Sequence, residues 1–166
     1  NPDVLEKPGG FLSTISPSRQ VDLDCPLGTS HEAPRVLAAG LSLKRYPLCY
    51  SLHRIADAAI EVAGMPGFSH EAVVSVEVEI GTRQLQMAPH RQPANELQAR
   101  YSAPFAVASG LVARAAGFAQ LDPAFFGCEA VRRLIERTQL KPTEGVNPQD
   151  PVFDVSDRVR VRMADG

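Results

Sequence analysis

The sequence predicts an α+β fold in which one antiparallel sheet is covered by helices on one face. In residues 72–80, AVVSVEVEI, apolar side chains recur at every second position, which is the spacing of a strand with one buried face. In residues 51–64, SLHRIADAAIEVAG, they recur at steps of three and four, which is the spacing of an amphipathic helix. Both patterns return later in the chain, and a domain that mixes them in this way is typically α+β.

The strands are expected at four places. The clearest is 72–80, whose polar residues are Ser and Glu, so that one face is apolar and the other polar. Such a strand suits an antiparallel sheet that is covered on one side. The other three are 35–43, 140–145 and 158–163, the last with its basic side chains outward, and 85–88 is a candidate partner strand for the clearest one.

Three helices are predicted, over 51–64, 96–118 and 129–138. In the first, Ser51 is a suitable N-cap and Gly64 a suitable stop. The second contains Pro104, which removes a backbone donor and clashes with the preceding turn of a helix. The helix proper is therefore expected to begin near Ser102, with Pro104 in its first turn.

Composition and charge limit the classes of function. Hydrophobic residues make up 44% of the 166 residues and charged residues 22%, the balance of a globular domain. The net charge is −2 without a block of like charges, which argues against binding to nucleic acid or to a membrane surface. No apolar run approaches the roughly 20 residues that span a bilayer. Three widely spaced cysteines predict neither a disulfide framework nor a structural zinc site, and they favour a reducing, cytoplasmic setting.

The first 34 residues differ in composition from the rest of the chain. They are rich in Pro, Gly, Ser and Asp, and they carry one short apolar patch in PGGFLSTI, at residues 8–15. We therefore expect residues 1–34 to be a linker and residues 35–166 to be the α+β domain. An N-terminal segment with so few apolar residues also predicts that the chain is a piece of a longer one.

One short turn, KRYPLCYSLH at residues 44–53, gathers a cation, aromatic rings, a thiol and an imidazole. Lys44 ends an expected strand and His53 lies in the first turn of the next helix, so both are expected to face one crevice. An ammonium suits a carboxylate ligand, and an imidazole can act as an acid or a base near neutral pH. The alternative is that Lys44 is solvated, Cys49 is a buried core residue, and His53 hydrogen-bonds Asp57 one turn later.

A second candidate stretch is ARYSAPFAVASGL, at residues 99–111. Arg100 and Ser102 precede a helix, and an arginine beside a helix start is able to clamp a carboxylate through two hydrogen bonds. The alternative is a capped core helix with Arg100 on its polar side. The remaining histidines lie far apart in expected loops, so no metal-ligand spacing emerges and no metal is expected.

Four segments resemble recurring stretches of the MmgE/PrpD family, the 2-methylcitrate dehydratase-like proteins. They are PGGFLSTI, KRYPLCYSLHRIADAAIE, ARYSAPFAVASGL and VRVRMADG. The second resembles the family's characteristic K-x-[YF]-P-x-C-x-x-x-H motif, and the last resembles the strand that ends its smaller domain. The four segments occur in the family's order and span nearly the whole chain.

The resemblance implies that residues 35–166 are the smaller α+β lid domain of a two-domain enzyme, entered through residues 1–34 from a large helical domain. Activities in the family include dehydration of 2-methylcitrate, decarboxylation of cis-aconitate and epimerisation of iminodisuccinate. All of them act on small di- or tricarboxylates without a metal or an organic cofactor. A carbon–oxygen lyase (a dehydratase) or a related isomerase is therefore implied, with the helical domain of the same chain as partner and a homodimer as assembly. The isolated chain is then expected to be inactive.

The resemblance also implies roles for single residues. Lys44 matches the family's lid lysine, which would bind a substrate carboxylate and stabilise developing charge. Lys44 and His53 are the implied catalytic residues, and Cys49, Arg100 and Ser102 are implied to bind substrate. Some decarboxylases carry a histidine where Cys49 stands, so that reaction is less expected. The alternative to an enzyme is a non-catalytic α+β module that binds a ligand or regulates.

Overall fold

The computed structural model describes residues 10–15, 37, 40–151 and 153–164, and it divides into two units, Asn1–Ser42 and Leu43–Gly166. In the first unit, a short helix α1 (Phe11–Ile15) is described. The strand expected at 35–43 is not found in the part of that segment that is described, which has helical backbone at Leu37 and no regular structure at 40–43. Gly40 has a left-handed backbone with φ of 71°, which an extended strand does not tolerate. The remaining residues of that expected strand lie outside the described residues.

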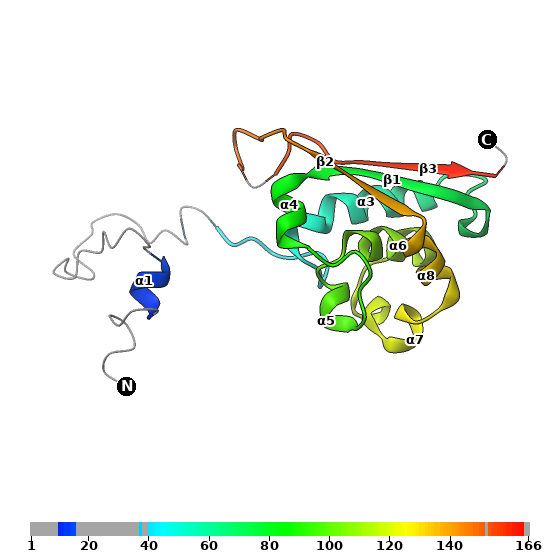
Figure 1. Cartoon of the computed structure of the whole chain (residues 1–166), viewed down its shortest axis with the longest axis horizontal. Coiled ribbons are helices and arrows are strands. Elements are labelled where there is room, and N and C mark those ends of the chain that lie inside the picture. The colour runs from blue at the N-terminus through cyan, green and yellow to red at the C-terminus, as the bar shows by residue number, and fades with distance from the viewer. Residues whose placement is uncertain (1–9, 16–36, 38–39, 152, 165–166) are drawn as a thin grey trace. The chain divides into compact units, whose positions relative to one another are not determined.

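The second unit is built on a three-stranded sheet with the order β2-β1-β3 (Figure 1). Its strands are β1 (Val73–Gly81), β2 (Thr138–Thr143) and β3 (Arg158–Met163). β1 pairs with β3 antiparallel, as expected, but with β2 in parallel, so the prediction of a purely antiparallel sheet is wrong. The reason is the connection from β1 to β2, which passes through several helices. It brings the chain back to the end of the sheet where β1 begins, so β2 runs in the same direction as β1.

The central strand follows the predicted alternation over most of its length. Val76, Val78 and Ile80 are buried, and they face the helices. At its beginning, Val73 is fully buried whereas Val74 is 40% exposed, because the pairing with β3 is irregular between Val73 and Ser75. A register irregularity of this kind shifts the inward face by one residue, which a strictly alternating pattern does not reveal.

The helices confirm most of the sequence pattern. Besides α1 they are η2 (Tyr50–Leu52), α3 (His53–Ala63), η3 (His70–Ala72), α4 (Thr82–Met87), α5 (Glu96–Ala99), α6 (Ala103–Ala113), η4 (Phe118–Leu121), α7 (Pro123–Phe126) and α8 (Glu129–Glu136). Ser102 is the N-cap of α6, as expected, and its hydroxyl oxygen accepts a hydrogen bond from the Phe105 N–H at 3.2 Å. Ser51 does not cap α3. It lies inside η2, and its hydroxyl donates to the Gln84 carbonyl.

The candidate strand at 85–88 is wrong, because residues 85–87 belong to the helix α4 and Ala88 is its C-cap. In this helix, the side chain of Gln84 is completely buried and is hydrogen-bonded to segments that lie far away in the sequence. These tertiary bonds hold the segment in a helical turn, and a local pattern of apolar residues carries no information about them.

Helices α3, α6 and α8 lie on the same side of the sheet, and their apolar faces form the core with β1 (Figure 1). The closest approach is between α3 and α6, where Gly110 faces Ala56 and Ala59. A methyl group built on Gly110 would lie 2.8 Å from the Ala59 Cβ and 3.1 Å from the Ile60 backbone nitrogen. The two helices therefore touch at the backbone, and a small residue is required at this point.

Within the described residues, no helix combines the length and the apolar character that crossing a lipid bilayer requires.

The contact between α3 and α6 leads to a stability prediction. Gly110→Ala should lower the free energy of unfolding by about 1–2 kcal/mol, because overpacking outweighs the gain in helix propensity. Urea denaturation followed by circular dichroism measures the difference. Gly117→Ala is the control, since its added methyl group meets Gln120 Oε1 at an ordinary 3.5 Å. An equal or smaller effect of the Gly110 substitution would contradict this account of the packing.

Candidate functional site

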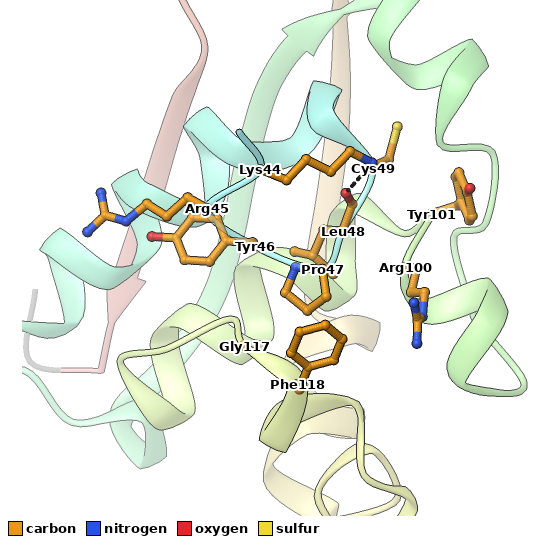
Figure 2. A pocket seen from close by; sticks show the side chains of 10 residues that line it. All are labelled: Lys44, Arg45, Tyr46, Pro47, Leu48, Cys49, Arg100, Tyr101, Gly117 and Phe118. Atoms are coloured by element: carbon orange, nitrogen blue, oxygen red, sulfur yellow. Dashed lines mark hydrogen bonds between the residues drawn. The ribbon is translucent and has the colours of Figure 1, made fainter. Parts of the chain in front are cut away.

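A pocket of about 370 Å³ lies in the second unit, beside the turn that precedes α3 (Figure 2). Three segments line it: residues 44–49, residues 100–101 between α5 and α6, and residues 117–118 at the start of η4. The first two segments are joined by a hydrogen bond of 2.7 Å from the Cys49 N–H to the Arg100 carbonyl oxygen. The pocket is thus assembled from the turn at residues 44–49 and two segments that lie more than fifty residues later in the sequence.

The turn at residues 44–49 is held by its buried side chains. Tyr46, Leu48 and Cys49 are each less than 10% exposed. The Tyr46 hydroxyl donates a hydrogen bond of 2.5 Å to Asp57 Oδ1 on α3. Burial, together with this hydrogen bond, raises the pKa of Tyr46 to about 12, so the phenol remains a proton donor at neutral pH.

Lys44 is exposed, and its Nζ donates a hydrogen bond of 3.4 Å to the Leu48 carbonyl oxygen of the same turn. The pocket contains two further cations, but both are paired with carboxylates outside it. Arg45 lies 3.2 Å from Asp57, and Arg100 lies 2.5 Å from Glu96. Lys44 has no such partner among the described residues, and no acidic side chain is found among the described residues that line the pocket. Its ammonium is therefore the uncompensated charge of this pocket.

Cys49 lines the pocket as a free, buried thiol. Its Sγ lies 3.2 Å from the Ser51 Oγ and 3.9 Å from the Met87 carbonyl oxygen. The sulfur is thus engaged by neighbouring polar groups and is positioned as a weak hydrogen-bond donor beside the pocket.

His53 is the first residue of α3, and it does not line the pocket. Its side chain is buried behind the turn, where its ring contacts the rings of Tyr46 and Tyr50 at centroid distances of 5.3 and 5.4 Å. Burial lowers the pKa of His53, backbone hydrogen bonds with Leu48 and Tyr46 oppose this, and the charge of Lys44 lowers the pKa further. The hydrogen bond to Asp57 that the sequence suggested as an alternative is not observed.

Of the two candidate residues in the stretch 99–111, only one lines the pocket. Arg100 lines the pocket, but its guanidinium points away from Lys44 in Figure 2 and pairs with Glu96. Ser102 is fully buried as the cap of α6 and is not a lining residue. The structure therefore brings Lys44, Cys49 and Arg100 to one pocket and places His53 and Ser102 outside it.

Aromatic residues that the sequence analysis did not single out also line the pocket. Tyr101 and Phe118 are 41% and 75% exposed. The expected helix over 96–118 would have placed Phe118 at its far end. Instead α6 ends at Ala113, and Arg114 adopts a left-handed backbone with φ of 52° that turns the chain back toward the pocket. The local sequence does not predict this turn, because arginine rarely adopts a left-handed backbone.

A buried polar network supports the turn from the other side. Gln84 Nε2 donates to the Ser51 carbonyl oxygen and to Asp157 Oδ2, both at 3.0 Å, and Gln84 Oε1 accepts from the Asp154 N–H at 3.1 Å. Asp157 Oδ2 also accepts from Arg54 Nε at 2.8 Å. One amide thereby joins the start of α3 to the loop before β3.

The comparison with family models matches residues 46–166 to the MmgE/PrpD C-terminal domain. The chain belongs to the MmgE/PrpD family. This confirms the resemblance drawn from the sequence motifs, and the family includes dehydratases. No curated protein matches the chain. Lys44 lies two residues before the matched region, so its position at the pocket is an observation that is independent of the match.

The buried network leads to a second stability prediction. Gln84→Met should lower the free energy of unfolding by about 2–4 kcal/mol, because it leaves the Ser51 carbonyl, the Asp154 N–H and one hydrogen-bonding position of Asp157 without their partner. Thermal and urea denaturation measure the loss.

The matched control is Gln86→Met on the same helix, where the side chain is exposed. It should change the stability by less than about 0.5 kcal/mol. If both substitutions had the same effect, the network would not be a stabilising feature of this fold.

Proposed function

We propose that this chain forms the lid domain of an MmgE/PrpD-type lyase or isomerase that acts on small di- or tricarboxylates, as 2-methylcitrate dehydratase-like proteins do. The observation that carries the proposal is the Lys44 ammonium, which stands at a pocket without a carboxylate of its own. A pocket with an unpaired cation attracts an anionic ligand, and a carboxylate is the common anion that an ammonium binds by hydrogen bonds.

The walls of the pocket support this assignment. Pro47 and Phe118 supply apolar surface on the lining, while the Cys49 thiol is engaged by Ser51 and Met87. An apolar wall reduces the local dielectric constant and strengthens the attraction between the ammonium and a carboxylate. In the proposed enzyme, Lys44 would bind one carboxylate of the substrate and stabilise negative charge that develops beside it.

Within the part of the chain that is described, no histidine and no carboxylate lines the same pocket. Its lining side chains are cations, tyrosines, a thiol and apolar groups, and His53 lies outside it. We therefore propose that the proton-moving residues belong to a helical domain of the same parent chain, which this lid would close over while excluding water. A homodimer and a cytoplasmic setting are parts of the same proposal.

One observation favours a second candidate function. A pocket that holds an unpaired cation but no acid–base pair suffices for binding, so the alternative is a non-catalytic α+β module that binds a carboxylate ligand or regulates. Both candidates require carboxylate binding at Lys44, and they differ in whether chemistry follows.

Carboxylate binding at Lys44 is directly testable. Lys44→Ala should weaken the binding of citrate by at least about tenfold, because it removes the one uncompensated charge of the pocket. Isothermal titration calorimetry on the 166-residue chain measures this affinity. In the full-length parent, the same substitution should reduce kcat/KM by a similar factor.

The control for this experiment is Lys141→Ala, because Lys141 is an exposed residue of β2 that is paired with Glu77. It should leave citrate binding unchanged. Equal affinities of the wild-type chain and the Lys44 variant, or no citrate binding by the wild-type chain, would contradict the proposed function.

The chain alone should not turn over citrate, 2-methylcitrate or cis-aconitate, since it would supply the carboxylate-binding wall without the proton-moving groups. Product analysis by chromatography after prolonged incubation tests this expectation. Turnover that disappears with Lys44→Ala would show that the acid–base group lies within these 166 residues.

A further inference from the structure

A second pocket, of about 400 Å³, lies between the loop before α5 and the helices α7 and α8. Its walls are residues 92–94 of the loop, residues 126–127 at the end of α7, and three residues of α8. None of them lines the pocket beside Lys44. The volume falls within the range of roughly 300–1,000 Å³ that is typical of small-molecule sites.

The walls of this second pocket are fixed to the rest of the domain. The Phe126 ring contacts the core ring of Phe105 at a centroid distance of 5.8 Å. Ile135 is only 8% exposed and belongs to the core. On the loop side, the Ala94 N–H donates a hydrogen bond of 2.9 Å to Oε1 of Gln98 on α5. The pocket is therefore formed by the fold itself, before any ligand arrives.

Two charged residues of α8, Arg132 and Glu136, line the pocket, and both are exposed. Their spacing of four residues often produces an ion pair on a helix, yet within the described residues no ion pair is found for either of them. The adjacent Arg133 differs, because its guanidinium donates to the His70 carbonyl oxygen at 3.3 Å. The pocket thus presents one cation and one anion whose charges are available to a ligand.

The arrangement of these charges selects the chemistry of the ligand. Side chains one helical turn apart have Cβ atoms about 5–6 Å from each other, so a small head group is able to contact both. A guanidinium binds a carboxylate through two hydrogen bonds, and the carboxylate of Glu136 accepts hydrogen bonds from an ammonium. A ligand with a single charge would leave the opposite side chain without a partner.

The apolar part of the lining adds a second requirement. Pro93, Phe126 and Ile135 offer hydrophobic surface beside the two charges. Burial of an apolar ligand side chain against this surface is favourable, whereas a polar side chain would lose hydration without gaining hydrogen bonds there.

We propose that this second pocket is a binding site for an α-amino acid with a large apolar side chain. Arg132 binds its carboxylate, Glu136 binds its ammonium, and Phe126 and Pro93 contact its side chain. The inference does not rest on the proposed function, because it involves neither Lys44 nor any other residue of that pocket.

Isothermal titration calorimetry on the 166-residue chain tests the proposal with L-phenylalanine as the probe. Two further ligands each lack one charge: 3-phenylpropionate lacks the ammonium, and 2-phenylethylamine lacks the carboxylate. We expect phenylalanine to bind at least about fivefold more tightly than either, since each missing group removes one ordinary hydrogen-bonded contact.

Variants assign the two contacts separately. Arg132→Gln should weaken phenylalanine binding by about fivefold and remove its advantage over 2-phenylethylamine. Glu136→Gln should cause a similar loss and remove the advantage over 3-phenylpropionate. The matched control is Arg91→Gln, an exposed arginine next to the loop wall that does not line the pocket, and it should leave all three affinities unchanged. Thermal melting of each variant shows that folded proteins are compared.

Three results would overturn the inference: no binding of phenylalanine to the wild-type chain, equal binding of the three ligands, or loss of phenylalanine binding in Lys44→Ala with retention in Arg132→Gln. Citrate titrations on the same proteins keep the two hypotheses apart. If citrate does not bind while phenylalanine binding depends on Arg132 and Glu136, the proposed function fails and the amino-acid site stands.

Discussion

The pocket depends on one packing constraint, the contact between α3 and α6 at Gly110. Because Ala56 and Ala59 face a glycine there, the two helices approach to backbone contact. The segments that lead into them then meet, and the Cys49 N–H bonds to the Arg100 carbonyl at 2.7 Å. A larger residue at the crossing would move these segments apart. The core therefore determines where the charged turn lies, although none of its small residues lines the pocket.

The positive charge of the pocket depends on which basic residues form ion pairs with carboxylates and which do not. On the solvent face of the sheet, Glu77 and Glu79 pair with basic residues of β2 and β3. Hydrogen bonds with Lys141 and Arg160 lower the pKa of Glu77, so this face stays ionised and its charges offset one another. Exposed pairs of this kind contribute little stability, but they offset the charges of Lys141, Arg158 and Arg160. Among the three cations that line the pocket, Lys44 differs from Arg45 and Arg100 because no ion pair with a carboxylate is found for it within the described residues.

The fold separates the two residues of the segment 44–53 that the sequence suggested as catalytic, Lys44 and His53. Lys44 and Cys49 are at the pocket, whereas the imidazole of His53 packs against Tyr46 and Tyr50 outside the pocket lining, where burial lowers its pKa. The lowered pKa disfavours a second positive charge close to the ammonium. This buried position differs from the place in the pocket that the residue type alone suggests.

The sequence by itself determined the elements whose pattern is local. It predicted β3 at its observed bounds, α3 and β1 closely, and the start of α6 at Ser102, because spacing, a capping hydroxyl and a proline act within a few residues. It also placed Lys44 and Cys49 in one turn. Only the tertiary structure decided the parallel pairing of β2, the helix around Gln84, and the arrival of Phe118 at the pocket. Each of these depends on contacts between segments far apart in the chain, whose free energies no local pattern contains.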